Sequence, residues 1–171
     1  MTRDYLAALG ERVLIYDGAT GTSVQARDLG PDDFGGKQLE GCNEALVLSR
    51  PDVVDDVHRS FFEAGADVVE TDTFGGSRPK LAEYGLGDRI YEINRLAAEI
   101  ARAAADREAA RRGSDCFVAG SLGPTGFLPS TTDPTLSNIT FGELVDIFEE
   151  QGRALVDGGA DVLLVEDAES A

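Results

Sequence analysis

The sequence has few of the residues from which disulfide frameworks and metal centres are built, with two cysteines and one histidine among 171 residues. Cys42 and Cys116 are far apart and lack the spacing of metal ligands, so we expect neither a disulfide framework nor a compact zinc motif. Both are expected to be ordinary small side chains. His58 falls within a predicted helix, on the side away from the predicted functional loops, and is expected on the helix surface.

Long apolar segments are also absent. No apolar run approaches the ~20 residues that span a bilayer, and residues 1–5 lead into no long apolar region of the kind that a signal peptide contains. We therefore expect a cytoplasmic protein.

Positive charge is scarce. Fifteen lysines and arginines against 32 aspartates and glutamates give a net charge of −17. Such a surface repels phosphate backbones and anionic lipids, so neither nucleic acid nor membrane is expected as a partner. The acidic excess is expected to serve solubility.

The sequence does contain an alternation of apolar runs and helical segments. Short runs rich in β-branched residues predict four buried strands, at 13–16, 68–71, 116–120 and 162–166. Amphipathic patterns predict a short helix at 2–10 and longer ones at 52–64, 88–112 and 140–157. This alternation indicates an α/β fold with parallel strands joined by right-handed crossovers.

Several residues mark the ends of these helices. Pro51 opens the second predicted helix, and Gly65 and Gly113 end the second and third. Thr140 and Glu143 form a predicted capping box at the start of the last helix. In that helix we expect five residues to face inward: Phe141, Leu144, Val145, Phe148 and Leu155. Residues 26–50 show little periodicity and predict a long functional loop, as does the stretch through Pro134.

Polar, glycine-rich clusters follow every predicted strand, at 17–22, 70–76, 120–126 and 166–170. Ligands bind at the carboxyl ends of parallel strands, and the opposite connections are short. This asymmetry, together with the absence of a Gly-x-Gly-x-x-Gly motif, favours a TIM-type (β/α)8 barrel over a dinucleotide-binding sheet. Because eight βα units take ~250 residues, residues 1–171 with four strands are expected to form the first half of a barrel.

One short sequence motif occurs twice. Gly65-Ala66-Asp67 leads into an apolar run that ends at Glu70, and Gly159-Ala160-Asp161 leads into another that ends at Glu166. Two strands of one design, each ending in a carboxylate, indicate one sheet with one functional edge.

The motifs, taken in order, resemble the homocysteine S-methyltransferase family, and within it the N-terminal homocysteine-binding domains of cobalamin-dependent methionine synthases. The resemblance covers residues 12–167, and the Asn138-Ile139-Thr140-Phe141 phrase favours the methionine synthases over the betaine-dependent relatives. The remaining matching pieces are Asp17 to Thr22, Glu40 to Glu44, Ser49 to Val53, Phe62 to Asp67, Glu70 to Phe74, Gly123 to Gly126 and Gly158 to Asp161.

This resemblance implies a (β/α)8 barrel with one zinc ion that binds homocysteine as a thiolate, whose sulfur attacks a methyl donor. It implies methylcobalamin, carried on other modules, as that donor. A thiol of pKa about 8.5 is mostly protonated at neutral pH, and zinc deprotonates it. The family's three zinc-binding cysteines lie in the second half of the barrel, so we expect no complete zinc site, no catalytic residue and no activity in this chain alone.

The resemblance also implies a set of substrate-binding residues. Asp17 and Glu166 are expected to hold the ammonium group of homocysteine through charge-assisted hydrogen bonds. Glu70 is expected either to join this site or to brace it from within its strand. The backbone around Ala19, Thr20 and Gly21 is expected to bind the substrate carboxylate, and Thr71, Thr73 and Phe74 are expected to line the pocket.

Two positions depart from the family, which usually has asparagine at position 72 and threonine at position 167. Asp72 and Asp167 each add an acid beside a site that must hold a thiolate. They are expected to raise the pKa of neighbouring carboxylates by like-charge repulsion, or to weaken substrate binding.

Two other interpretations remain open. The chain could be a non-catalytic half-barrel that binds an amino acid or self-assembles, because the first and fourth strands leave open edges that favour pairing. It could also be a different barrel enzyme that binds a divalent metal through its acids.

Overall fold

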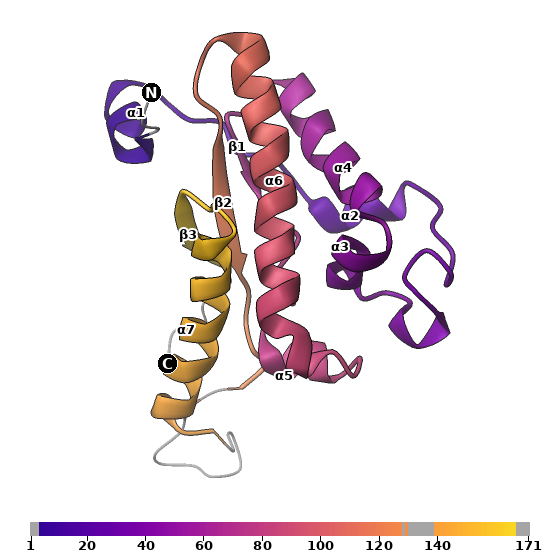
Figure 1. Cartoon of the computed structure of the whole chain (residues 1–171). Helices are drawn as coiled ribbons and strands as arrows, with labels where there is room; N and C mark the ends of the chain where they lie inside the picture. The colour runs from indigo at the N-terminus through magenta and orange to yellow at the C-terminus, as the bar shows by residue number, and fades with distance from the viewer. Residues whose placement is uncertain (1–3, 128, 130–138, 167–171) are drawn as a thin grey trace.

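A computed structural model describes residues 4–127, 129 and 139–166 (Figure 1). The expected alternation of helices and strands is confirmed there. The helices are α1 (Tyr5–Glu11), α2 (Thr20–Gln25), α3 (Leu46–Ser49), α4 (Pro51–Ala64), α5 (Arg78–Ala82), α6 (Ile90–Arg112) and α7 (Phe141–Asp157). The strands are β1 (Val68–Glu70), β2 (Phe117–Leu122) and β3 (Val162–Val165), and short 3-10 turns are η1 (Lys37–Leu39), η2 (Asn43–Ala45) and η3 (Gly87–Arg89).

The strands form one parallel sheet in the order β1-β2-β3. Helices α4 and α6 pack on one side of it, where Val69 and Val118 meet Phe62 and Ala101. Helix α7 packs beside α6, so that Leu155 lies against Leu122 and Ala98 (Figure 1). The other side carries Leu14, Val68, Phe117 and Ala119, and Tyr5 of α1 packs against them. Strands β1 and β2 are buried by these contacts, whereas Leu163 and Val165 of β3 remain exposed.

The predicted first strand, 13–16, is an exposed edge instead of a buried strand. It touches β1 through one bridge, from Tyr16 to Val68, and the backbone N–H of Asp17 donates to the Val68 carbonyl at 3.0 Å. Leu14 is buried, but Val13 is 83% exposed and Ile15 57% exposed. Within the described residues no strand lies on the far side of this segment, which leaves its alternate side chains in solvent.

The repeated Gly-Ala-Asp phrase has a structural role at the amino ends of the strands. One oxygen of Asp67 accepts the backbone N–H of Ile15 at 3.0 Å and lies 2.8 Å from the Arg12 guanidinium. In the same way, one oxygen of Asp161 accepts the backbone N–H of Val118 at 2.8 Å and bonds Arg102 at 2.7 Å. Each aspartate thus fastens its own strand to the preceding one and fixes the register between them.

The predicted helix ends are confirmed. Helix α4 begins at Pro51 and is followed by Gly65 in the left-handed conformation, with φ of 111°. Helix α6 is followed by Gly113, also left-handed, with φ of 72°. Thr140 and Glu143 form both hydrogen bonds of the capping box of α7. These are local signals, and neighbouring elements do not change them.

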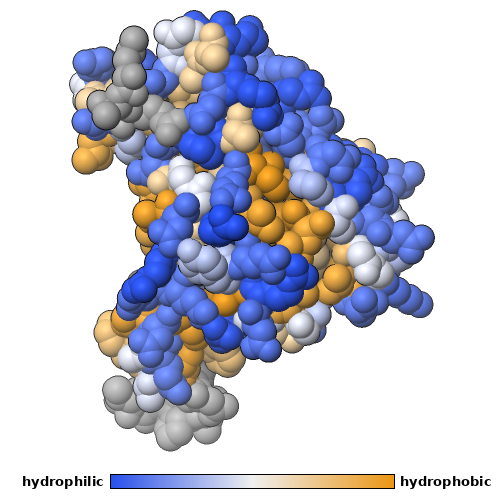
Figure 2. Space-filling model, in the orientation of Figure 1, coloured by the Kyte–Doolittle hydropathy of each residue, from blue (hydrophilic) through white to orange (hydrophobic). Residues whose placement is uncertain are grey.

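The inward face predicted for the last helix is wrong at two positions. Leu155 is fully buried, and Leu144 and Phe148 are partly buried, but Phe141 is 74% exposed and Val145 45% exposed. In the described part of the chain the main packing neighbours of α7 are α6, β2 and β3. The apolar pattern of α7 therefore extends beyond the residues that these neighbours bury. Figure 2 shows hydrophobic residues at the surface over the middle of the molecule, between hydrophilic ones.

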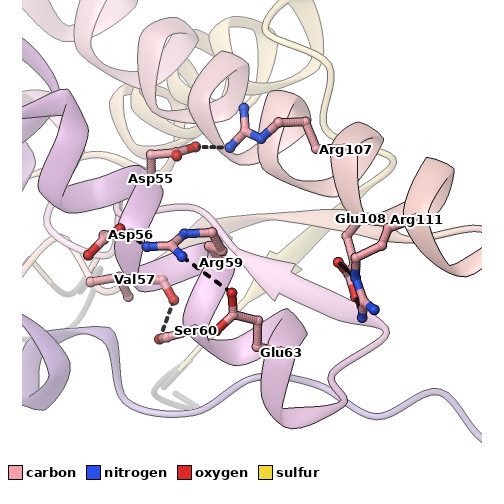
Figure 3. A network of polar contacts seen from close by, with 9 residues as sticks. All are labelled: Asp55, Asp56, Val57, Arg59, Ser60, Glu63, Arg107, Glu108 and Arg111. Atoms are coloured by element: carbon pink, nitrogen blue, oxygen red, sulfur yellow. Dashed lines mark hydrogen bonds and ion pairs between the residues drawn. The ribbon is translucent and has the colours of Figure 1, made fainter.

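The exposed faces of α4 and α6 carry several arginine–carboxylate pairs. Arg107 of α6 binds Asp55 of α4, and Arg59 binds Asp56 and Glu63 within α4 (Figure 3). Such exposed pairs add about 0–1 kcal/mol each.

No helix within residues 4–127 and 139–166 is both long and apolar enough to cross a membrane. Residues 128 and 130–134 of the long loop predicted through Pro134, and Asp167, lie outside the described residues.

His58 is fully buried, which contradicts its predicted place on the helix surface. Helix α4 has neighbours on several sides, since α2, α3, α6 and β1 all pack against it. Neither ring nitrogen of His58 has a hydrogen-bond partner among the described residues. Burial lowers the pKa of His58 to about 4, so the ring is neutral in the folded protein at neutral pH.

This burial predicts a loss of stability in mild acid. In the unfolded chain His58 takes up a proton near its ordinary pKa of about 6.5, while the folded protein resists protonation until about pH 4. The His58→Gln variant cannot take up that proton. Between about pH 7 and pH 5 the free energy of unfolding of the native protein should therefore fall by about 2 kcal/mol relative to that variant. Urea unfolding of both proteins at the two pH values checks this, and an unchanged difference between them would contradict it.

Candidate active site

A pocket of about 440 Å³ lies at the carboxyl end of the sheet, where the sequence predicts ligand binding. It draws its walls from segments that are far apart in the sequence. The lining residues are Asp17, Gly18, Ala19, Thr20, Gly21, Asn43, Glu44, Glu70, Thr71, Asp72, Phe74, Ser121 and Glu166.

The pocket is strongly acidic. Five of its lining residues are carboxylic acids, and none is lysine, arginine or histidine. Like charges at this density oppose one another, and a bound cation would relieve that repulsion. The composition of the wall therefore favours a ligand with a positively charged group.

Asp17, Glu70 and Glu166 form one acidic group in the pocket. One oxygen of Asp17 accepts the backbone N–H of Glu70 at 3.0 Å, which fastens the end of the exposed edge segment to the end of β1. Burial raises the pKa of Asp17 to about 7. Burial and the nearby Glu166 raise the pKa of Glu70 to about 7. Glu70, for which two roles were left open, places its side chain at the pocket wall.

Ser121 holds Glu166 in place. Its hydroxyl donates to the Glu166 carboxylate, and the backbone N–H of Glu166 donates to the Leu122 carbonyl at 3.0 Å. Ser121 itself is buried. The sequence predicted that Ser121 lies in a loop after its strand, whereas β2 continues to Leu122. Its position near the end of a predicted strand is the signal that could have identified Ser121 as a site residue.

The two predicted pocket threonines do different things. Thr71 lines the pocket, but Thr73 is fully buried and does not. The Thr73 hydroxyl donates to the Ser121 carbonyl at 2.8 Å, and the two threonine hydroxyls lie 2.6 Å apart. The Ser121 backbone N–H donates to the Thr71 hydroxyl at 3.0 Å. Thr73 directly precedes Phe74 in the chain but does not reach the pocket. Its hydrogen bonds to Thr71 and Ser121 support the pocket wall from outside.

The turn after the edge segment brings backbone groups to the pocket. Ala19, Thr20 and Gly21 all line it, and α2 begins at Thr20. No side chain caps this helix start. The first N–H groups of a helix have no partner within the helix, so this turn brings hydrogen-bond donors to an otherwise acidic wall.

Glu44 and Asp72 form a second, deeper acidic group. Glu44, from the loop region 26–50, accepts the backbone N–H of Gly75 at 2.6 Å and the Cys42 thiol at 3.7 Å. Burial and then Glu44 raise the pKa of Asp72 well above its usual range. The negative charge expected at Asp72 is therefore suppressed at neutral pH. Sequence reasoning gave Glu44 no role, although it lies within one of the motifs that carry the family resemblance.

The residues present do not fit a zinc site. Within the described residues no group of three or more histidine, cysteine, aspartate and glutamate side chains is arranged to hold a metal ion. Cys42 and Cys116 are both buried free thiols, and burial raises the pKa of Cys42 to about 12. A thiol in that state is a poor metal ligand, because the thiolate is the form that binds.

Residues 14–171 match the family of homocysteine S-methyltransferases. The chain belongs to the homocysteine S-methyltransferase family. It is 45% identical over 163 residues to the methionine synthase of Mycobacterium tuberculosis, and 43% identical over the same length to that of Mycobacterium leprae. Each match covers 95% of this chain but only 13% of the relative. The chain therefore spans about an eighth of the length of these methionine synthases.

Solved structures of this family show the same fold. The oxidized form of the homocysteine methyltransferase MmuM from Escherichia coli superposes with a TM-score of 0.74 at 22% identity, over 94% of this chain and 56% of that one. The metallated form of MmuM gives 0.75 at 23% identity, with the same coverage. The three-stranded parallel sheet thus resembles part of a barrel-type fold, and the described residues do not close the barrel.

The contact between the carboxyls of Glu70 and Glu166 predicts a coupled titration. In Glu166→Gln the pKa of Glu70 should fall from about 7, because the charge of Glu166 and its hydrogen bond both raise that pKa. It should stay above its ordinary value, since burial is the larger cause. Carboxyl-carbon NMR titration of Glu70 measures this. Asp88→Asn, which removes a fully exposed acid outside the pocket, is the matched control, and equal Glu70 titrations in both variants would contradict the assignment.

Proposed function

We propose that residues 1–171 are the N-terminal half of a homocysteine-binding (β/α)8 barrel. In the protein that carries the complete barrel, this half binds homocysteine for methyl transfer to give methionine. One observation carries the proposal: a chain of this family places a pocket with five acids and no basic residue at the carboxyl ends of its strands. An amino acid substrate has the ammonium group that such a wall favours.

In this proposal Asp17 and Glu166 hold the ammonium group, with Glu70 beside them. A bound cation favours the charged forms of Asp17 and Glu70, whose pKa values burial raises in the empty pocket. The backbone N–H groups at Ala19, Thr20 and Gly21 bind the substrate carboxylate, since anions are stabilised by such groups. Thr71 and Phe74 form the wall beside the substrate side chain, and Thr73 supports Thr71 from behind.

Zinc and methylcobalamin complete the proposal but involve no residue described in this chain. Zinc, held by cysteines in the remaining half of the barrel, supplies deprotonation of the substrate thiol. Methylcobalamin and folate modules of a longer protein are the proposed partners for methyl transfer. This chain alone is then inactive, because it binds and orients the substrate but does not activate the sulfur. A cytoplasmic location stays a prediction.

The second candidate is a half-barrel that binds an amino acid or assembles without catalysis. Apolar side chains are exposed at both edges of the sheet: Val13 and Ile15 at one edge, and Leu163 and Val165 at the other. A divalent-metal barrel enzyme is not favoured, because no group of three or more histidine, cysteine, aspartate and glutamate side chains among the described residues has the arrangement to hold a metal ion.

The proposed ammonium contacts predict that Asp17→Asn and Glu166→Gln abolish homocysteine binding in the protein with the complete barrel. Each variant removes a charge-assisted hydrogen bond while keeping the size of the side chain. Isothermal titration calorimetry measures the affinity. Asp88→Asn, at an exposed position, should leave it unchanged. Wild-type affinity in either pocket variant would reject the role of that residue.

The open edges predict self-association of the 171-residue chain. Unpaired strand edges with exposed apolar side chains favour pairing with another copy. Light scattering should show dimers or larger species at working concentration, and replacing Val13 and Val165 by lysine should shift them toward monomers. A monodisperse monomer of the unmodified chain would contradict this prediction.

A further inference from the structure

Two buried amide side chains, Asn94 of α6 and Gln151 of α7, lie behind the pocket wall and have no place in the proposed substrate contacts. Both are fully buried, and neither lines the pocket. The helices that carry them pack side by side (Figure 1). A buried amide is costly unless its polar atoms find partners, so the partners of these two side chains indicate what they do.

The two amides bind both ends of one turn, residues 73–76. The backbone N–H of Gly76 donates to the Thr73 carbonyl at 2.8 Å and closes this turn. Gln151 Nε2 donates to the same Thr73 carbonyl at 3.0 Å, and Asn94 Nδ2 donates to the Gly76 carbonyl at 2.8 Å. The amides also bind each other, since Gln151 Nε2 donates to Asn94 Oδ1 at 3.2 Å. The pair therefore holds the turn at its first and its last residue.

The contacts of Asn94 fix the orientation of both amides. Its Nδ2 group also donates to the Ile90 carbonyl at 2.8 Å, so both of its N–H donors meet carbonyls and its Oδ1 atom is left to accept. Gln151 therefore presents its Nε2 group to Asn94. The Oε1 atom of Gln151 is buried without a hydrogen-bond partner among the described residues, which costs stability. An apolar side chain would avoid that cost, so the donors of Gln151 indicate a positioning role.

The turn leaves no room for a side chain at Gly76. A Cβ atom added there would lie 2.6 Å from Asn94 Oδ1 and 2.9 Å from Gln151 Nε2. Glycine at this position therefore allows the amide pair to approach the backbone of the turn closely.

Phe74 lies inside this turn and lines the pocket. Two further contacts restrain it. A Cβ atom added at Gly123, in the loop after β2, would lie 2.9 Å from the Phe74 ring, and Glu44 accepts the backbone N–H of Gly75 at 2.6 Å. The turn is thus held from the β2 loop, from η2 and, through the amide pair, from α6 and α7. Together these contacts set the position of the Phe74 ring.

We propose that Asn94 and Gln151 are a pair of positioning residues that hold the turn 73–76 and thereby set the position of Phe74 against the substrate side chain. They act through the backbone of the turn, since neither of them lines the pocket. The proposal rests on the proposed function for the identity of the ligand, but the hold of the pair on the turn can be measured without any ligand.

Amide hydrogen exchange of the 171-residue chain, followed by NMR, tests this hold. Gln151→Met keeps the size of the side chain but removes its donors. The exchange rate at the Gly75 and Gly76 N–H groups, relative to that of the β2 amides, should rise by about tenfold in this variant. Leu155→Ala, on the buried face of the same helix, is the matched control, because it loses packing but no hydrogen bond to the turn.

In the control the relative exchange rate at the two glycines should not rise, since a general loss of stability opens β2 as well. No rise in Gln151→Met, or an equal rise in Leu155→Ala, overturns the proposal.

Homocysteine binding in the protein with the complete barrel, measured by calorimetry, tests the effect on the pocket wall. Gln151→Met and Asn94→Leu should each weaken binding by about tenfold, and Leu155→Ala should stay within about twofold of native affinity. Because the pair acts as one unit, the double variant should bind no more than about threefold more weakly than either single variant. Two independent contributions would give about a hundredfold loss in the double variant, and that result overturns the pairing.

The failure of this proposal differs from the failure of the proposed function. If the native protein binds homocysteine and both single variants bind it equally well, or Leu155→Ala weakens binding as much as they do, the positioning role is wrong and the function stands. If the native protein binds no homocysteine, the proposed function fails, and the exchange rates still decide whether the amide pair holds the turn.

Discussion

The register between neighbouring strands is the constraint on which the rest of this structure depends. Asp67 and Asp161, at the amino ends of β1 and β3, each accept a backbone N–H from the preceding strand and bind an arginine. A side chain fixed at the start of a strand determines what lies beside its end, because parallel strands rise by a constant step. Asp67 fixes β1 against the segment 13–16, and Asp161 fixes β3 against β2. In the sheet Ala119 pairs with both Glu70 and Val162, and Glu70 and Glu166 line one pocket.

The buried acids of the empty pocket lower the stability of the folded protein at neutral pH. Burial raises the pKa values of Asp17 and Glu70 to about 7, so ionising them in the empty protein is unfavourable. Stability from these two acids is present below their ordinary pKa of about 4 and is lost as pH rises toward about 7. A fold that needed only stability would place apolar residues there. The acids therefore indicate a ligand that contributes the missing positive charge.

The sequence predicted the features that depend on local signals and on the place of a residue along a strand. The family resemblance implied Asp17 and Glu166, and each directly follows an apolar run. Prolines, glycines and caps marked the ends of α4, α6 and α7. Glu44 could not be found in this way, since it reaches the pocket from a region without periodicity. The predicted exposure of His58 and the predicted burial of Val13 were wrong for the same reason. Burial depends on neighbours in space: α2, α3, α6 and β1 pack against the helix that carries His58, whereas among the described residues no strand pairs beyond the segment that carries Val13.

The two acidic groups of the pocket differ in a way that explains their different roles. Asp17 accepts the Glu70 N–H, and Glu166 accepts the Ser121 hydroxyl. Asp72 is buried, and its Oδ2 atom has no hydrogen-bond partner among the described residues, so burial and the charge of Glu44 raise its pKa. Burial and the charge of Glu44 thus disfavour a negative charge at position 72, so this aspartate adds less charge to the pocket wall than its residue type suggests.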